Sequence, residues 1–185
     1  MIELLEQALL TQRLFDDEAW KSCIIGGLAV IRWGQPRLTR GVDVSLFTGF
    51  GDERRIAERI LAQLEPRVVD AIECAAAHRV LLARTHAGTP VDIAFAGYPF
   101  EAEIIERSTT YRYTPDVELR NISAEDLVVL KAFANRRQDW GDIAGIAARQ
   151  ASLDWRAIFE RLAPLVELKA EPAILDELRS IQRGG

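Results

Sequence analysis

Residues 24–45, with the sequence IIGGLAVIRWGQPRLTRGVDVS, contain the pattern that decides the fold of this chain. A short apolar run from Cys23 to Ile25 leads into two glycines, Gly26 and Gly27, and then into the helical pattern LAVIRW. A strand that turns into a helix through two glycines brings backbone N–H groups and the positive end of a helix dipole to one point. Such a point suits a phosphate group.

A second β-branched run, Val42-Asp43-Val44, follows the glycines after about fourteen residues. Alternation along the predicted strand 42–48 places Asp43 on the face opposite Val42 and Val44. A carboxylate at this position could hold the metal that accompanies a bound phosphate. Gly41, two residues earlier, stands where a second carboxylate would complete such a site.

Composition predicts a soluble, folded, cytoplasmic protein. At 185 residues the chain is one domain, or one domain with a small appendage, and 49% hydrophobic residues are enough for a core. The net charge of -5 gives no basic field for non-specific binding to nucleic acid or membrane. Neither of the two cysteines has a Cys or His at ligand spacing, so both are predicted to be reduced thiols. The start MIELLEQALL lacks the basic region of a signal peptide, and no apolar run has transmembrane length.

Residues 1–122 alternate between helical and β-rich patterns. The runs HRVLLART (78–85) and VDIAFA (91–96) are joined by a short loop that contains glycine, which predicts an antiparallel hairpin. Asp92 lies near the start of the second strand of that hairpin. Val68 and Val69 are expected to begin another extended segment.

From Ser123 onward the pattern is entirely helical. The sequence Ser123-Ala124-Glu125-Asp126 resembles a capping box and predicts the start of the first of these helices. The predicted helical spans are approximately 124–135, 138–150, 154–166 and 172–182. We therefore predict an α+β fold in which a mixed α/β core (1–122) is followed by a helical region (123–185) packed on it as one compact unit.

Asp43 and Asp92 are the residues that point to chemistry. An acid inside a β-branched strand is costly to bury unless it is paired or bound to a metal. Carboxylates on adjacent strands can project into one cleft, as nucleotidyl transfer requires for its Mg²⁺ ions. A single strand acid is most often solvent-facing, but two of them downstream of Gly-Gly favour a functional site. The competing interpretation, a purely structural α/β domain, requires these two acids to lie far apart.

Three segments in order resemble the minimal nucleotidyltransferases of the DNA polymerase β superfamily: Gly26-Gly27-Leu28-Ala29, Arg37 to Val44, and Val91-Asp92-Ile93. The chain is most similar to the AbiEii/AbiGii-type toxin nucleotidyltransferases. The helical half adds the similar segments 124–127, 131–133 and 137–143. The resemblance spans residues 20–169, and its specificity lies in the order and gaps of motifs that are individually weak.

The resemblance implies transfer of a nucleoside monophosphate from a nucleoside triphosphate, with Mg²⁺, to a tRNA-like RNA or a protein acceptor. It also implies a toxin–antitoxin system with an antitoxin as partner. The implied nucleotide-binding residues are Gly26, Gly27, Arg37, Thr39 and Lys131. The implied catalytic and metal-binding residues are Asp43, as the second acid of an Asp-x-Asp pair, and Asp92, as the third acid.

Several of these residues have an equally good ordinary explanation. Lys131 fits a solvent-facing lysine on an amphipathic helix, and Arg37 and Thr39 fit plain turn residues. Asp139 and Asp142 share a helix face and could form a secondary polar site, although Asp139 also fits a first-turn acid.

Gly41 is the one departure from the superfamily pattern, because it occupies the place of the first acid of the Asp-x-Asp pair. Loss of one such electrostatic contact costs on the order of 10²–10³ in rate, or about 3–4 kcal/mol. The glycine is either an engineered change or the result of natural drift. An engineered change is the simpler explanation, because a single substitution removes one motif residue and leaves the others in place. We therefore predict a nucleotidyltransferase with impaired activity. The alternative is a catalytically degenerate module that binds a nucleotide or an antitoxin.

Overall fold

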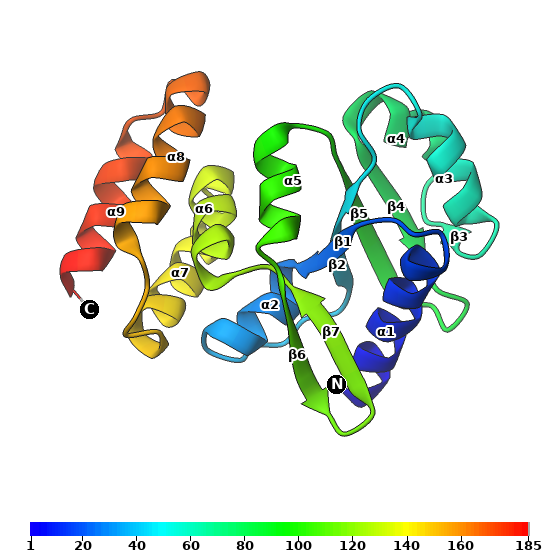
Figure 1. Ribbon diagram of the computed structural model, residues 1–185, viewed down its shortest axis with the longest axis horizontal. Helices are drawn as coiled ribbons and strands as arrows, with labels where there is room; N and C mark the ends of the chain where they lie inside the picture. Colours follow the sequence, from blue (N-terminus) through cyan, green and yellow to red (C-terminus); the bar gives the residue numbers. More distant parts are fainter. Residues whose placement is uncertain (185) are drawn as a thin grey trace. The chain divides into compact units, whose positions relative to one another are not determined.

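The computed structural model describes residues 1–184 and divides into two compact units (Figure 1). The first unit contains Met1–Leu28 and Leu38–Ile122, and the second contains Ala29–Arg37 and the chain from Ser123 onward. One of the boundaries between the two units falls between Ile122 and Ser123. Residues 29–37, which the sequence pattern placed in the first half, pack with the helical second unit instead.

The first unit is built on a mixed sheet. Within residues 1–184 seven strands form this sheet in the order β3-β4-β5-β2-β1-β7-β6. Their bounds are β1 Ser22–Ile25, β2 Val42–Phe47, β3 Glu65–Pro66, β4 Val80–Arg84, β5 Pro90–Ala96, β6 Thr109–Thr114 and β7 Val117–Asn121. The β1–β7 and β2–β5 pairs are parallel, and the other four pairs are antiparallel. The α+β class with a mixed sheet is confirmed.

Five helices of the described chain accompany this sheet: α1 Ile2–Asp17, α2 Gly26–Trp33, α3 Glu53–Leu61, α4 Ala71–His78 and α5 Pro99–Glu106. Helix α1 packs along β1, β2 and β7, α4 packs on β4, and α5 packs on β2. Helix α2 starts directly after β1 without an intervening loop, so the strand-to-helix turn at the two glycines is as sharp as the sequence predicted. Its last residues, from Ala29, belong to the second unit.

The core of the sheet follows the predicted alternation. Val42, Val44 and Leu46 of β2 are each at most 2% exposed, whereas Asp43 on the other face is only half-buried. The neighbouring strand β5 repeats the pattern, with Val91 and the alternate residues after it buried and Asp92 half-buried. Apolar burial thus holds the two strands together on one face and leaves the acid-bearing face more open.

The predicted hairpin is confirmed, because β4 and β5 pair antiparallel. The predicted extended segment at Val68 and Val69 is wrong: these residues lie in a bend and turn that precede helix α4. The segment from Ala71 is alanine-rich and short, and its helix is fixed by packing against α3 and β4, which local pattern does not reveal.

The second unit adds four helices after Ser123: α6 Ala124–Ala134, α7 Arg137–Arg149, α8 Trp155–Lys169 and α9 Ala173–Gly184. The Ser123 Oγ accepts a hydrogen bond of 3.1 Å from the Asp126 backbone N–H, so the predicted cap is confirmed. The 29–37 segment is tied to α7 by hydrogen bonds from the Arg149 guanidinium to the Gly34 carbonyl and from the Gln150 amide to the Trp33 carbonyl.

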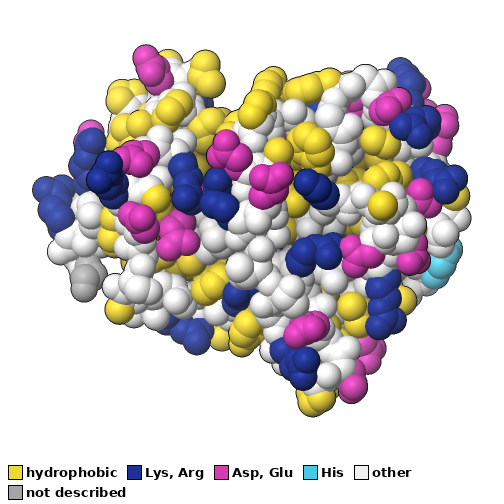
Figure 2. Space-filling model, viewed as in Figure 1, with side chains coloured by type: hydrophobic (Ala, Val, Ile, Leu, Met, Phe, Trp, Pro, Cys, Tyr) yellow, Lys and Arg dark blue, Asp and Glu magenta, His cyan; other side chains and the backbone are white. Residues whose placement is uncertain are grey.

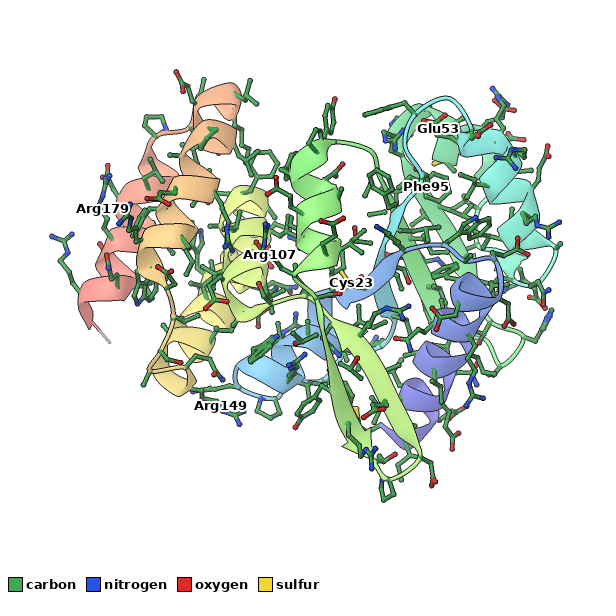
Figure 3. All side chains as sticks on the ribbon, viewed as in Figure 1. Cys23, Glu53, Phe95, Arg107, Arg149 and Arg179 are labelled. Carbon is green, nitrogen blue, oxygen red and sulfur yellow. The ribbon has the colours of Figure 1, made fainter. Side chains whose placement is uncertain are left out.

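The surface carries both signs of charge side by side. Figure 2 shows Lys and Arg interspersed with Asp and Glu on the visible face, in keeping with the absence of a basic field in the composition. Both cysteines are free thiols, and Figure 3 shows Cys23 on β1, where it is 1% exposed. Among residues 1–184, no helix has both the length and the apolar character needed to cross a membrane.

Candidate functional site

Asp43 and Asp92 are direct neighbours in the sheet. In the parallel β2–β5 pair the two residues stand opposite each other in register, so their side chains leave the same face. Adjacent strands lie about 4.8 Å apart, which brings the two carboxylates within reach of one ligand. The interpretation as a purely structural domain required these acids to lie far apart, and it is wrong on this point.

The glycine turn is built against Asp43. Gly26 has φ +60°, and a Cβ atom at this position would overlap the Asp43 Oδ2 atom. Both facts require glycine, because L residues with side chains avoid this backbone region and because the carboxylate occupies the space. The Gly27 N–H donates a 3.2 Å hydrogen bond to Asp43 Oδ2. The Gly27 amide at the start of α2 therefore stabilises the negative charge of Asp43, as expected at a helix N-terminus.

Thr39 and Gly41 lie beside this turn. A Cβ atom at Gly27 would overlap the Thr39 hydroxyl, so the threonine side chain packs directly on the glycine turn. The Thr39 Oγ1 donates a 3.4 Å hydrogen bond to the Gly41 carbonyl oxygen. A Cβ atom at Gly41 would lie 3.0 Å from the Pro90 carbonyl oxygen, which is close enough that Pro90 would have to move by a few tenths of an ångström. The structure thus brings six of the predicted site residues together: Gly26, Gly27, Thr39, Gly41, Asp43 and Asp92.

Arg67 is a member of this site that sequence reasoning missed. Its guanidinium forms an ion pair with Asp92 Oδ1, and the Arg67 N–H donates a 3.0 Å hydrogen bond to the Leu82 carbonyl of β4. The two side chains are partly open to solvent, with Arg67 29% and Asp92 43% exposed. Only the pairing of β3 with β4 and of β4 with β5 places Arg67 here, so no local spacing in the sequence could have found it.

The fit of the site to Mg²⁺ follows from these contacts. Asp43 and Asp92 offer carboxylate oxygens, which are suitable ligands, and Mg²⁺ commonly keeps several waters and phosphate oxygens in its shell. Gly41 offers no side-chain oxygen, and Arg67 already occupies one oxygen of Asp92. In the described part of the chain no three His, Cys, Asp or Glu side chains gather as a metal site. The residues present fit one ion held by two carboxylates and not a site with three acids.

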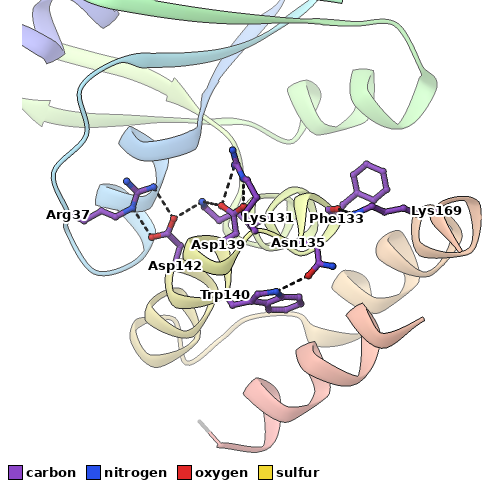
Figure 4. Close-up of polar contacts among 9 residues, drawn as sticks. Arg37, Lys131, Phe133, Asn135, Asp139, Trp140, Asp142 and Lys169 are labelled. Carbon is purple, nitrogen blue, oxygen red and sulfur yellow. Dashed lines mark hydrogen bonds and ion pairs between the residues drawn. The ribbon is translucent and has the colours of Figure 1, made fainter. Parts of the chain in front are cut away.

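Lys131 and Arg37 belong to a different group of charges, within the second unit (Figure 4). The Lys131 ammonium donates to Asp139 Oδ1 at 2.9 Å and to Asp142 Oδ2 at 2.7 Å. Arg37 binds Asp142 through two hydrogen bonds of 2.8 and 3.0 Å, and Arg136 binds Asp139 from the other side. We refer to these five residues as the α6–α7 ion cluster.

The α6–α7 ion cluster is buried at its centre. The side chains of Lys131, Asp139 and Asp142 are 6%, 0% and 6% exposed. Burial alone would raise the pKa of both aspartates, but ion pairs with Lys131 and with the flanking arginines outweigh it, so both pKa values lie below the ordinary 3.8. The interpretation of Lys131 as a solvent-facing lysine is wrong. The nucleotide-binding roles of Lys131 and Arg37 stay predictions, and each would require an exchange of these ion pairs.

Comparison with known proteins identifies solved structures that have a similar fold. None of the known protein families compared with the sequence matches it, and neither does any curated protein. Solved structures do match. An antigenic nucleotidyltransferase-like protein from Paracoccidioides brasiliensis is similar with a TM-score of 0.55 and 16% identity, over 96% of this chain and 92% of that one.

Two further solved structures are similar over most of their length. The antibiotic-resistance factor ANT(2'')-Ia has a TM-score of 0.53 and 15% identity, over 95% of each chain. The lincosamide antibiotic adenylyltransferase LnuA, solved with lincomycin bound, has a TM-score of 0.50 and 13% identity, over 77% of this chain and 96% of that one. At these identities the likeness establishes that the chain has a nucleotidyltransferase-like fold.

Proposed function

We propose that this chain is a nucleotidyltransferase, with the site formed by Asp43, Asp92 and the Gly26-Gly27 turn. The observation that carries the proposal is the in-register pair of Asp43 and Asp92 on adjacent parallel strands, beside the N-terminus of α2. The reaction forms a bond between an acceptor oxygen and the α-phosphorus of a nucleoside triphosphate. It breaks the bond to pyrophosphate and releases the proton of the acceptor.

Each residue of the site has a separate role in this reaction. The Gly27 N–H is used by Asp43, and the other backbone amides at the start of α2 would bind phosphate oxygens. Mg²⁺ held by Asp43 and Asp92 would neutralise phosphate charge when bound. The Gly27 amide keeps Asp43 oriented toward the turn. Thr39, packed on the same turn, shapes the wall of the site.

The proposal extends to three classes of acceptor. Our expectation from the sequence is a tRNA-like RNA or a protein in the cytoplasm, with the chain acting as a toxin held by an antitoxin. The names of the similar structures add a third class, because LnuA is a lincosamide adenylyltransferase and was solved with lincomycin. We therefore include lincosamide antibiotics among the acceptors to be tested.

A degenerate binding module is the second candidate, and two observations favour it. Gly41 removes one acid, and Arg67 pairs with Asp92 in the position of a competing cation. Such a module would bind nucleoside triphosphates without turnover.

The test restores the missing acid. Purified Gly41→Asp is incubated with each α-labelled nucleoside triphosphate, Mg²⁺, and total tRNA, cell lysate or lincomycin. We expect the Gly41→Asp variant to transfer label on the order of 10²–10³ times faster than the unaltered chain. Gly41→Asn is the matched control, since it has the same size and the same contact with Pro90 but lacks the carboxylate.

The outcome separates the two candidates. Adding Asp43→Asn to Gly41→Asp is expected to abolish transfer. Absence of transfer to every acceptor by a folded Gly41→Asp variant would exclude the enzyme. Calorimetric binding of ATP by that same variant would then assign the degenerate module, and absence of binding would exclude it as well.

A further inference from the structure

Helix α1 carries apolar side chains on its outer face. Its inner face is buried in the first unit through Leu5, Ala8 and Phe15. On the outer face Ile2 is 67% and Leu10 is 54% exposed. A single exposed leucine is ordinary on a protein surface, so the significance of this face depends on what surrounds it.

A groove runs beside these residues. It has a volume of about 640 Å³ and lies between α1 and the turn that joins β6 to β7. One wall is formed by Ile2, Leu9 and Leu10 of α1, and the other includes Pro115 of the turn and Val117 at the start of β7. Figure 1 shows the N-terminal end of α1 beside this hairpin turn. The groove is therefore long in the direction of the helix and apolar in its middle.

Three charged residues line the groove: Glu6 and Arg13 on α1, and Asp116 on the turn between β6 and β7. Glu6 and Arg13 line it on either side of Leu9 and Leu10. They are seven residues apart, which is about 10 Å along a helix and too far for a mutual ion pair. Among residues 1–184 neither side chain takes part in an ion pair. The α1 wall of the groove thus offers one anion and one cation that have no partner within the described chain, and Asp116 adds a second anion on the opposite wall.

The charges on α1 are complementary to those on a second α1 that runs antiparallel to it. Glu6 and Arg13 lie symmetrically about the midpoint between Leu9 and Leu10. If a second α1 lay antiparallel in the groove, Glu6 would face the partner subunit's Arg13, and the same contact would repeat at the other end. The leucines would meet at the centre. A two-fold axis generates this kind of isologous contact.

We propose that the groove beside α1 binds α1 of a second copy of this chain and forms a two-fold symmetric dimer. Apolar contact at Leu9 and Leu10 provides the burial, and the two Glu6–Arg13 contacts fix the antiparallel direction. A helix of 16 residues is about 24 Å long, so the contact lies at the small end of specific interfaces. The dimer therefore forms and dissociates with protein concentration.

The test is a charge swap measured by sedimentation equilibrium of the full chain over a range of concentrations. E6R alone and R13E alone each place like charges opposite each other at both ends of the contact. We expect each to raise the dimer dissociation constant at least about tenfold. The double variant E6R/R13E reverses both charges, and we expect it to return the constant to within about threefold of the unaltered value. E58R, the same charge change on the exposed Glu58 of α3, is the matched control and leaves dimerisation unchanged.

Several results would overturn the proposal. An unaltered chain that stays monomeric at all concentrations excludes a second copy as the occupant and leaves the groove to a helix of another protein. Single swaps without effect, or a folded double variant that does not recover, would also contradict it. Circular dichroism checks that each variant is folded. As an independent measurement, Leu10→Cys next to the proposed axis is expected to give a disulfide-linked dimer under mild oxidation, and Glu58→Cys is not.

Discussion

The two groups of charged residues in this chain have similar parts and opposite properties. The pair Asp43–Asp92 of the first unit and the pair Asp139–Asp142 of the second each combine two aspartates with basic side chains. In the α6–α7 ion cluster Lys131 and both aspartates are buried, and the two arginines close the cluster from its more exposed sides. At the sheet the Asp92 side chain is 43% exposed, and a single arginine pairs with it.

The difference teaches how a site and a structural network can be told apart. A buried cluster in which each oxygen has a cation has no capacity left for a ligand, so its members act on stability. An acid pair that is half-exposed and lies next to a glycine turn can still accept a cation. Both pairs are equally visible in the sequence, and only their partners distinguish them.

The largest expected effect comes from a substitution that breaks the α6–α7 ion cluster. Lys131→Met removes the central cation and leaves the buried Asp139 and Asp142 without it. We expect the free energy of unfolding to fall by about 3–5 kcal/mol. Urea denaturation measures this. Lys169→Met is the control, because that lysine is 28% exposed and pairs with Glu171 at the surface, so its loss should cost less than about 1 kcal/mol. Equal losses in both variants would contradict the distinction.

Low pH should also lower the free energy of unfolding through the α6–α7 ion cluster. The pKa values of Asp139 and Asp142 lie below the ordinary 3.8, because ion pairs with lysine and arginine outweigh the effect of burial. These carboxylates therefore add stability above pH 3.8, and that contribution is lost as the pH falls through their lowered pKa values. We expect the free energy of unfolding to decline steeply below about pH 4. The double variant Asp139→Asn/Asp142→Asn should show a shallower decline, and an unchanged slope would count against this account.

A smaller effect is expected at the glycine turn. Gly26→Ala forces a residue with a Cβ atom to adopt φ +60° and displaces the Asp43 carboxylate. The backbone alone costs about 1–2 kcal/mol, measured as a fall in the free energy of unfolding. Nucleotide binding, followed by calorimetry, should weaken at the same time. Gly88→Ala, at another positive-φ glycine with open space around its Cβ position, serves as the control for backbone cost without loss of binding.

The smallest expected effect concerns the affinity of the Asp43–Asp92 site for Mg²⁺. Arg67→Gln removes the cation that pairs with Asp92, so Mg²⁺ should bind about tenfold more tightly, which corresponds to about 1.4 kcal/mol. Calorimetric titration with MgCl₂ checks this. Arg84→Gln removes a positive charge from the adjacent strand that pairs with Glu65 and not with Asp92. A similar gain in both variants would mean that general charge, and not the Arg67–Asp92 contact, controls the affinity.

Local pattern was sufficient for much of the fold. The bounds of β1, the alternation of β2 and the β4–β5 hairpin follow from apolar periodicity and from glycine in the connecting loop. The start of the second half follows from the Ser123 cap. These features depend on residues that are close in sequence, where propensity and capping act directly.

Other features depend on contacts between distant residues. Arg67 meets Asp92 only through two strand pairings, and Arg37 meets Asp142 across 105 positions in the sequence. The assignment of residues 29–37 to the helical unit has the same origin. Lys131 has an unremarkable position on its helix, and its burial is set by α7, which the pattern of α6 alone does not reveal.

The register of β2 against β5 has a consequence for how the chain can change. Because Asp43 and Asp92 are paired by strand register, the loop between β4 and β5 can gain or lose residues without separating the two acids. A deletion of one residue inside β5 before Asp92 is different, since it would turn that side chain to the buried face. The acid pair should therefore tolerate changes of length in the loop and be lost by a single deletion in the strand.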